Sequence, residues 1–279
     1  MQITFHGHAC VALRHGGTDV VIDPGSFSDA AGALRDADAV LVTHEHADHV
    51  DPDTLGTALG AREDLEVWGP EAVVSGLRAT LPDDAARRVH AVSPGDGIDL
   101  GGLEVVVGGG RHAEIHRDVP RISNVTYLVR GGGVAVYHPG DSVDLPVTRD
   151  ANTVDGPQDA RLDVLLAPVS APWLKIGETI DLVRALDPRV VVPVHDALLS
   201  QIGHGSVARL LDHARTGGTY EYRRLGAGES FTLAVDAHTV AEAVLREHPE
   251  YSEVALLEDD ETVPPRPEED AADAARERS

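Results

Sequence analysis

A run of small and β-branched apolar residues, AVLVT at 39–43, leads directly into the segment HEHADH. A continuous apolar run of this kind predicts a short strand buried on both faces. His44 and His46 are two residues apart, so in an extended chain their side chains point the same way. Asp48 and His49 follow after a turn. Four such groups buried without a cation would be costly, so the pattern predicts metal binding at the end of a rigid strand.

The donor groups elsewhere in the chain restrict the kind of metal site. Cys10 is the only cysteine, whereas the chain has 15 histidines. A disulfide within the chain and a thiolate-rich zinc site are therefore both excluded, and the ligands must be imidazoles and carboxylates. Zinc is the default for this donor set, and Mn(II) or Fe(II) is also compatible. The competing interpretation is a solvated histidine-rich turn, which the apolar strand directly before it disfavours.

Length and charge limit the partners that we expect. The chain of 279 residues fits one large domain or two small ones, and its formal net charge is −24. Such an acidic chain repels phosphate backbones, so we expect a small-molecule substrate and no nucleic acid. The sequence contains no apolar run of membrane-spanning length and no secretory signal at its start, which predicts no membrane insertion and a cytoplasmic location. A homo-oligomer is left open.

Hydrophobic patterns predict mostly strands and few helices in the first half, and alternating strands and helices in the second. We expect strands at 2–5, 10–14, 19–22, 39–43, 96–100, 103–108, 124–130, 133–137, 162–169 and 189–195, and in YEYRR and SFTLAV. We expect helices at 53–60, 70–80, 178–186 and 206–215. This composition of elements indicates an α/β or α+β fold with helices covering sheets.

The chain changes character near its C-terminal end. Residues 1–236 are predicted to form the folded domain, and residues 237–257 could add one surface helix. Residues 258–279 are rich in acids, contain Pro-Pro and lack apolar periodicity. Such a segment cannot bury enough apolar surface to offset the entropy of ordering, so it is predicted to be a disordered acidic tail.

His44-Glu45-His46-Ala47-Asp48-His49 resembles the H-x-H-x-D-H signature of the metallo-β-lactamase superfamily. Further matches follow the family's order: Asp23 in VVIDPG, His112 in GGGRHAEIH, Asp141 in VYHPGDS and His195 in VVPVHD. The opening FHGHACVAL resembles the ascorbate-phosphate-lactonase-like branch, which extends the resemblance over about 1–235. The family implies a four-layer αβ/βα sandwich of two mixed sheets, with metal ions at one edge between the sheets.

The resemblance also implies a role for each ligand in a dinuclear site. The first ion would be held by His44, His46 and His112, the second by Asp48, His49 and His195, and Asp141 would bridge them. Metal binding can lower the pKa of water from about 15.7 to about 7, and the resulting hydroxide would attack a carbonyl or phosphoryl centre. Asp48 would orient the hydroxide and pass a proton to the leaving group. Asp23 would orient the ligands rather than bind metal.

Other residues are candidates for supporting or substrate-facing roles. His116 is an alternative third ligand to His112, which lies nearer the strand end. His8, His138 and His204 could support ligands or line the mouth of the site, or serve only in local structure. In APVSAPWLKIG, Trp173 could form an apolar wall of the pocket. Lys175, the only lysine, could bind an anionic group of the substrate. A packed tryptophan with a surface lysine is the simpler alternative.

These features predict a metal-dependent hydrolase acting on a small molecule such as a lactone or a phosphodiester. The sequence has no G-x-S-x-G nucleophile elbow and no Walker A loop. A nuclease of the same superfamily is an alternative, but the −24 charge argues against it. A di-iron redox enzyme and a metal-binding protein without catalysis are the other two alternatives, and the same fold supports many reactions.

Overall fold

The computed structural model describes residues 1–146 and 162–234. The described residues belong to one compact unit, Met1–Ala234. The predicted surface helix at 237–257 and the predicted tail at 258–279 lie outside the described residues, so these predictions, with the domain limit at 236, stay predictions.

One mixed sheet is built mainly from the first third of the chain. Its seven strands are, in spatial order, β14 (Ser230–Thr232), β1 (Gln2–Gly7), β2 (Cys10–His15), β3 (Thr18–Ile22), β4 (Ala39–Leu41), β5 (Glu66–Gly69) and β6 (Val89–Ala91). Antiparallel pairing joins β14, β1, β2 and β3, and parallel pairing joins β3, β4, β5 and β6. The parallel strands need crossover connections, which the helices of this half supply.

The second mixed sheet repeats this order of antiparallel and then parallel pairing. Its seven strands are β13 (Glu221–Tyr222), β12 (Val190–Val194), β11 (Val164–Pro168), β10 (Val134–His138), β9 (Val125–Gly131), β8 (Glu104–Gly109) and β7 (Gly97–Asp99). Pairing is antiparallel from β7 to β10 and parallel from β10 to β13. β8, β10 and β12 therefore run in one direction, and their carboxyl ends lie at one edge.

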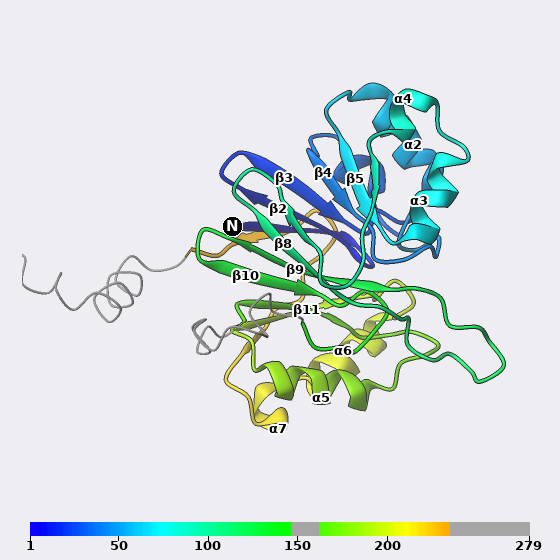
Figure 1. The fold of residues 1–279 in the computed structure, drawn as a ribbon. Coiled ribbons are helices and arrows are strands. Elements are labelled where there is room, and N and C mark those ends of the chain that lie inside the picture. The colour runs from blue at the N-terminus through cyan, green and yellow to red at the C-terminus, as the bar shows by residue number, and fades with distance from the viewer. Residues whose placement is uncertain (147–161, 235–279) are drawn as a thin grey trace, which may run out of the picture. The chain divides into compact units, whose positions relative to one another are not determined.

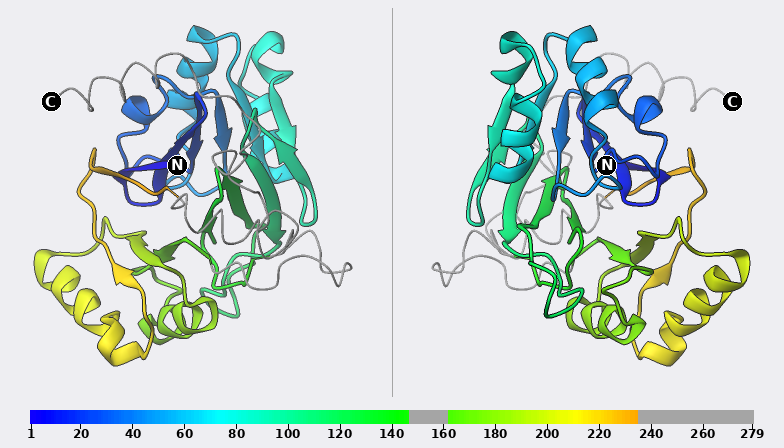
Figure 2. Two further views of the ribbon diagram at one scale, coloured as in Figure 1. Left: turned by 90° about the vertical axis from the view of Figure 1, so that its left-hand side faces the viewer. Right: turned by 90° about the vertical axis from the view of Figure 1, so that its right-hand side faces the viewer.

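Helices cover the outer face of each sheet, as Figures 1 and 2 show from three sides. On the first sheet these are α1 (Ala30–Ala33), α2 (Pro52–Ala61), α3 (Glu71–Arg78) and α4 (Asp83–Ala86), and on the second α5 (Ile176–Leu186), α6 (Gln201–Leu210) and α7 (His213–Thr216). The predicted αβ/βα sandwich of two mixed sheets is confirmed. None of the helices in the described ranges is long and apolar enough to cross a membrane.

The alternation of side chains along β9 connects the layers. Leu128 faces outward and joins the apolar cluster with Leu165 and Leu182 under α5. Tyr127 is buried, and its hydroxyl donates to the carbonyl of Val42 in the other sheet at 2.9 Å. Because successive strand residues point to opposite faces, one strand serves both the helix–sheet core and the core between the sheets.

The expectation of few helices in the first half is wrong. After β4 the chain alternates strand and helix, and sequence patterns missed α1, α4, β5 and β6. These elements are three or four residues long, too short to display a period.

The helix predicted at 206–215 is also wrong in its limits. α6 begins at Gln201, with the Ser200 hydroxyl accepting from the Gly203 amide, and ends at Leu210. A new turn, α7, starts after Asp212. Two glycines in the first turns of α6 weakened the helical pattern, whereas the Ser200 cap decides where the helix starts.

Candidate metal centre

The HEHADH segment leaves β4 and turns directly into α2. The amides of His49 and Val50 both donate to the carbonyl of His46 at 3.0 Å, which closes the turn. Asp51 then caps α2, accepting from the Thr54 amide at 3.2 Å. The loop after β3 packs tightly on this turn: a Cβ on Gly25 would lie 1.9 Å from the carbonyl oxygen of Asp48. A strand end, a helix cap and a close-packed glycine therefore fix the segment.

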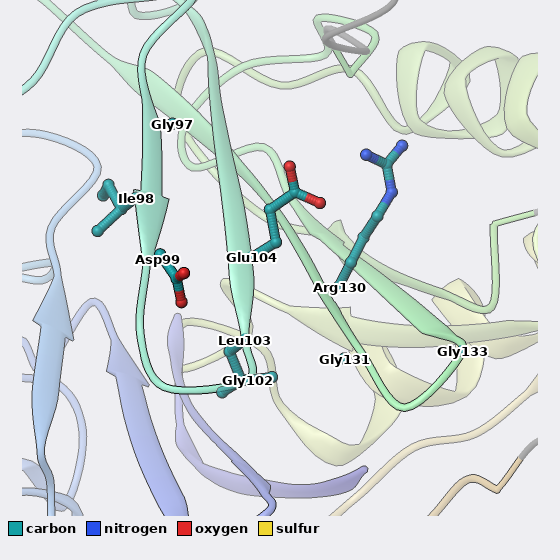
Figure 3. A pocket seen from close by; sticks show the side chains of 9 residues that line it. All are labelled: Gly97, Ile98, Asp99, Gly102, Leu103, Glu104, Arg130, Gly131 and Gly133. Atoms are coloured by element: carbon teal, nitrogen blue, oxygen red, sulfur yellow. The ribbon is translucent and has the colours of Figure 1, made fainter. Parts of the chain in front are cut away.

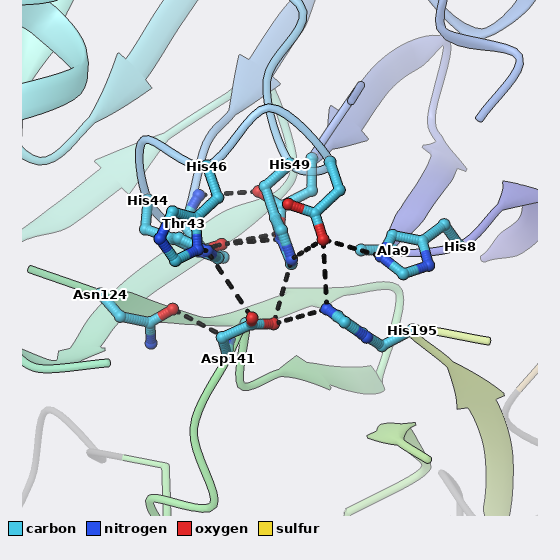
Figure 4. Close-up of polar contacts among 12 residues, drawn as sticks. His8, Ala9, Thr43, His44, His46, His49, Asn124, Asp141 and His195 are labelled. Atoms are coloured by element: carbon cyan, nitrogen blue, oxygen red, sulfur yellow. Dashed lines mark hydrogen bonds and ion pairs between the residues drawn. The ribbon is translucent and has the colours of Figure 1, made fainter. Parts of the chain in front are cut away.

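The other predicted ligands come from the second sheet. His112 follows β8, Asp141 follows β10 and His195 follows β12. Because these three strands run in the same direction, their ends meet at one edge, opposite the end of β4 (Figure 4). The topology therefore brings together residues that are far apart in sequence.

Two groups of potential ligands form at this edge. One consists of His44, His46, His112 and Asp141, and the other of His8, Asp48, His49 and His195. Within each group the potential ligand atoms all lie within 4.8 Å of one another. This spacing is that of side chains converging on one point, and it suits a cation at the centre of each group.

Asp141 lies between the two groups. Its Oδ1 is 3.0 Å from Nε2 of His49 and 3.2 Å from Nε2 of His195. Its Oδ2 is 3.2 Å from Nε2 of His112 and 3.8 Å from Nε2 of His44. Each carboxylate oxygen therefore faces one group, as a bridging ligand would (Figure 4).

The donor atoms at the centre lack the partners that buried polar atoms need. Nε2 of His49, His112 and His195 and Oδ1 of Asp141 are buried and have no hydrogen bond of acceptable geometry among the described residues. Leaving such atoms unpaired costs about 1–3 kcal/mol each. Divalent cations bound by imidazole and carboxylate would satisfy all four, so the residues present fit a metal pair.

The second ring nitrogen, Nδ1, is hydrogen-bonded to a backbone carbonyl in two of these histidines. Nδ1 of His112 donates to the carbonyl of Ala113 at 2.6 Å, and Nδ1 of His195 donates to the carbonyl of Ser170 at 2.7 Å. A histidine that donates through Nδ1 presents an unprotonated Nε2 when it is neutral. The surrounding carbonyls therefore select the tautomer that a metal ligand needs.

Asp23 orients His49 and the strand end together. It is fully buried, and its Oδ2 lies 2.7 Å from Nδ1 of His49. It also accepts from both the amide and the hydroxyl of Thr43 at 2.7 Å. A carboxylate paired with a histidine in this way can fix the orientation of the ring, and the orienting role of Asp23 stays a prediction.

Two further predicted residues touch the carboxylates of the centre. His8 is buried, its Nδ1 accepts from the Ala197 amide at 3.2 Å, and its Nε2 therefore donates to Oδ2 of Asp48 at 3.1 Å. Trp173 is buried as well, and its indole N–H donates to Oδ2 of Asp141 at 2.9 Å. Both contacts restrict the carboxylates to one orientation.

The remaining predicted residues lie outside the two groups. His116 has a side chain that is 59% exposed and pairs with Asp118, so the structure places His112 rather than His116 at the centre. His138 is buried, but it donates to the carbonyl of Ala9 and accepts from the Gly140 amide.

The last two candidates are also engaged away from the centre. Lys175 is exposed at the start of α5, where its amide donates to Glu178. His204 lies in α6, with its Nε2 3.9 Å from Oδ2 of Asp196.

Sequence patterns missed two polar residues that support the centre. The Thr43 hydroxyl lies 3.0 Å from Nδ1 of His44 besides bonding Asp23. The side chain of Asn124 accepts from the Asp141 amide and donates to the carbonyl of Pro139, each at 3.0 Å. Both residues belong to predicted strands, and nothing in the sequence distinguishes them from ordinary strand residues.

Burial and mutual contacts shift the pKa values of the side chains at the centre in opposite directions. Burial, reinforced by the neighbouring His49, lowers the pKa of His44 well below its usual value. Burial also lowers the pKa of His195, but its contacts with Asp141 and Asp48 outweigh this effect and raise the pKa to about 9. Burial raises the pKa of Asp141, but the adjacent His49, His112 and His195 reverse this and hold the pKa well below the usual range. The carboxylates therefore favour a proton on His195, with which a bound cation would compete.

Two pockets differ in their relation to the centre. The larger lies where β7 turns into β8 and β9 turns into β10, and its lining includes Asp99, Glu104 and Arg130 (Figure 3). None of the predicted metal ligands lines it. The smaller pocket is bordered by His46 and His112, and it therefore adjoins the candidate centre.

Comparison with known families places the chain. The family described as "Beta-lactamase superfamily domain" matches residues 2–195. Protein Rv0786c of Mycobacterium tuberculosis is 35% identical over 74% of this chain and 88% of its own length. UPF0173 protein PF0020 of Pyrococcus furiosus is 30% identical over 72% of this chain and 86% of its own length. A UPF0173 metal-dependent hydrolase of Heliobacterium modesticaldum is 27% identical over 70% of this chain and 82% of its own length.

The chain therefore belongs to the metallo-β-lactamase superfamily. Within it, the chain belongs to the UPF0173 metal-dependent hydrolase family.

Solved structures agree with the fold. The metallo-β-lactamase fold protein YhfI of Bacillus subtilis matches with a TM-score of 0.62 at 15% identity, over 82% of this chain and 98% of that one. The diiron β-hydroxylase CmlA of Streptomyces venezuelae matches with a TM-score of 0.60 at 21% identity, over 83% of this chain and 54% of that one. At these identities the likeness shows the fold alone, and one fold can support many reactions.

Proposed function

We propose that this protein hydrolyses a small molecule at a dinuclear metal centre. His44, His46 and His112 would hold one divalent cation, Asp48, His49 and His195 the other, and Asp141 would bridge them. The observation that carries the proposal is the position of Asp141, whose two oxygens face the two groups separately. Bound cations would activate water and stabilise the negative charge that develops at a carbonyl or phosphoryl oxygen.

The chain's own residues would position ligands and move a proton. Asp48 is the least buried carboxylate of the centre, with 22% of its side chain exposed, so it can reach both an attacking water and a leaving group. His8 would hold Asp48 in place through its 3.1 Å hydrogen bond. Trp173 would hold Asp141 in the same way and exclude water from one side.

The proposed substrate is a lactone or a phosphodiester-like molecule, and zinc is the preferred metal. A place in the ascorbate-phosphate-lactonase-like branch stays a prediction from FHGHACVAL. A cytoplasmic location is part of the same proposal. The net charge of −24 continues to argue against a nuclease.

Metal content and a substrate panel test the proposal together. We expect the full chain to bind two equivalents of zinc and to hydrolyse at least one class among lactones, thioesters and phosphodiesters. His46→Ala and Asp48→Ala should lose at least a hundredfold in kcat/KM while keeping the fold by circular dichroism. Wild-type rates in either variant would contradict the mechanism, and stoichiometric iron with redox activity would replace the hydrolase by the di-iron alternative.

A further inference from the structure

Apolar side chains are exposed next to the candidate metal centre, where a polar rim would be expected around a polar substrate. On the loop between β8 and β9, Ile115 is 41% exposed and Val119 is 42% exposed. From this surface we propose that the substrate carries a neutral apolar group, alkyl or aryl, next to its scissile bond. This inference names the substrate class of the proposed hydrolase and therefore rests on the proposed function.

The small pocket beside the centre is lined by histidines and by apolar residues. The histidines are His46 and His112. Four further lining residues form what we call the apolar wall: Ile115, Val119, Pro120 and Ile122. A group seated against this wall would lie within contact of two proposed ligands. Covering the exposed part of the wall would remove apolar surface from water, which favours binding.

The apolar wall is attached to the centre by hydrogen bonds. The amide of His112 donates to the carbonyl of Ile122 at 3.0 Å, which joins the two ends of the loop. The amide of Ala113 donates to the carbonyl of Asp141 at 2.8 Å. The wall is thus fixed to two of the proposed ligands, so an apolar group that it binds would place the reacting atom at a defined distance from the centre.

The charges around the pocket disfavour a cationic group. Arg121 is the one charged residue that lines it besides the histidines, and its Nε donates to the carbonyl of His112 at 2.7 Å. This bond ties the guanidinium to the loop through its Nε. No carboxylate lines the pocket, so a cationic substituent has no partner there.

A second exposed apolar side chain lies beside the other group of potential ligands. The ring of Phe27 contacts the ring of His8 edge-on, with centroids 5.3 Å apart, and Phe27 is 52% exposed. His8 belongs to the group of potential ligands that includes Asp48, His49 and His195. An exposed apolar ring therefore lies next to this group too, as a substrate with apolar substituents around a polar reacting centre would require.

Alkyl hydroxamates test the inference without any knowledge of the natural reaction, because the hydroxamate head binds metal and the tail probes its surroundings. The metal-loaded full chain would be titrated by calorimetry with acetyl, butanoyl, hexanoyl and octanoyl hydroxamates. Complete burial of a methylene is equivalent to about fourfold in affinity, so we expect about two- to threefold per methylene against a partly exposed wall. The double variant Ile115→Ser, Val119→Ser should remove most of this dependence.

The control is Leu210→Ser, which changes an exposed apolar residue of α6 that does not line the pocket. It should leave the dependence on tail length unchanged. Tight binding of acetohydroxamate with no gain from longer tails would overturn the inference while leaving the metal centre intact. A carboxylate-ended tail that binds more tightly than the neutral tail of equal length would also overturn it. Failure of every hydroxamate to bind, in a protein that retains no metal, would overturn the proposed function itself.

Discussion

His8 illustrates how a single side chain could support the candidate metal centre without being one of the ligands predicted from the sequence. The Ala197 amide fixes its tautomer, and its Nε2 is left to donate to Asp48. Its backbone has φ of +54°, a conformation that L-residues seldom adopt, so the fold holds His8 there against local strain.

We predict that His8→Phe lowers the affinity for the second metal ion by about 10–100-fold, the usual effect of removing a residue that orients a ligand. Affinity for the first ion should change little, because the contacts of His8 are with Asp48 rather than with His44 or His46. Competition with a chromogenic chelator measures both constants. His8→Gln, which can still donate, should recover part of the loss, and the exposed His116→Ala should match the wild type. Equal losses at both ions would contradict this role.

At the scale of elements, the loop after β3 and the turn before α2 approach closely at Gly25. A Cβ there would lie 1.9 Å from the carbonyl oxygen of Asp48, so Gly25→Ala has to displace the turn that holds Asp48 and His49. We expect a loss of about 1–3 kcal/mol in the free energy of unfolding together with reduced metal content. Denaturant unfolding and elemental analysis measure the two effects.

Gly60→Ala is the matched control for Gly25→Ala. Gly60 lies in α2, and a Cβ at this position would meet no atom within 4 Å. Alanine should therefore stabilise the protein by about 0.5–1 kcal/mol through higher helix propensity, with metal content unchanged. A stable Gly25→Ala variant with full metal content would show that the close approach of the two loops is dispensable.

The elements that sequence patterns predict well are those whose period or apolar run is long. The hairpin strands β1, β2 and β3 agree within two residues at either end, and α5 within two. The donors of HEHADH could be named because they follow an apolar run, whereas His112, Asp141 and His195 could be named only from the resemblance to the metallo-β-lactamase superfamily. Their convergence could not be derived from periodicity, since it depends on the order of β8, β10 and β12 in the second sheet. Support from backbone groups, such as the Ala197 amide on His8, has no trace in the sequence at all.

At the scale of the whole molecule, the proposed ligands connect the two sheets. The HEHADH segment follows β4 of one sheet, and the other ligands follow strands of its partner, so bound cations would link the two halves of the sandwich. We predict that chelation of the metal lowers Tm by about 10 °C. Free metal at about a thousand times its dissociation constant contributes about 4 kcal/mol, and each kcal/mol shifts Tm by about 2–4 °C in a domain of this size. A Tm that ethylenediaminetetraacetate leaves unchanged would contradict the prediction.

The pH dependence of stability should differ with and without metal. In the metal-free fold Asp141 and Asp48 raise the pKa of His195 to about 9 from the ordinary 6.5. The folded state then binds a proton that the unfolded state releases, and this stabilisation is complete below pH 6.5 and is lost as the pH rises through about 9. Tm of the chelated protein should therefore fall across that window.

Cations compete with this proton, so metal affinity should rise over the same window and the metal-loaded protein should hold or gain stability. Thermal unfolding between pH 6 and 10, with and without chelator, measures both trends, and His195→Gln should flatten the metal-free curve. A metal-free Tm that rises from pH 6.5 to 9 would mean that the carboxylates do not hold a proton at His195, and hence that the centre is not arranged to exchange protons for cations.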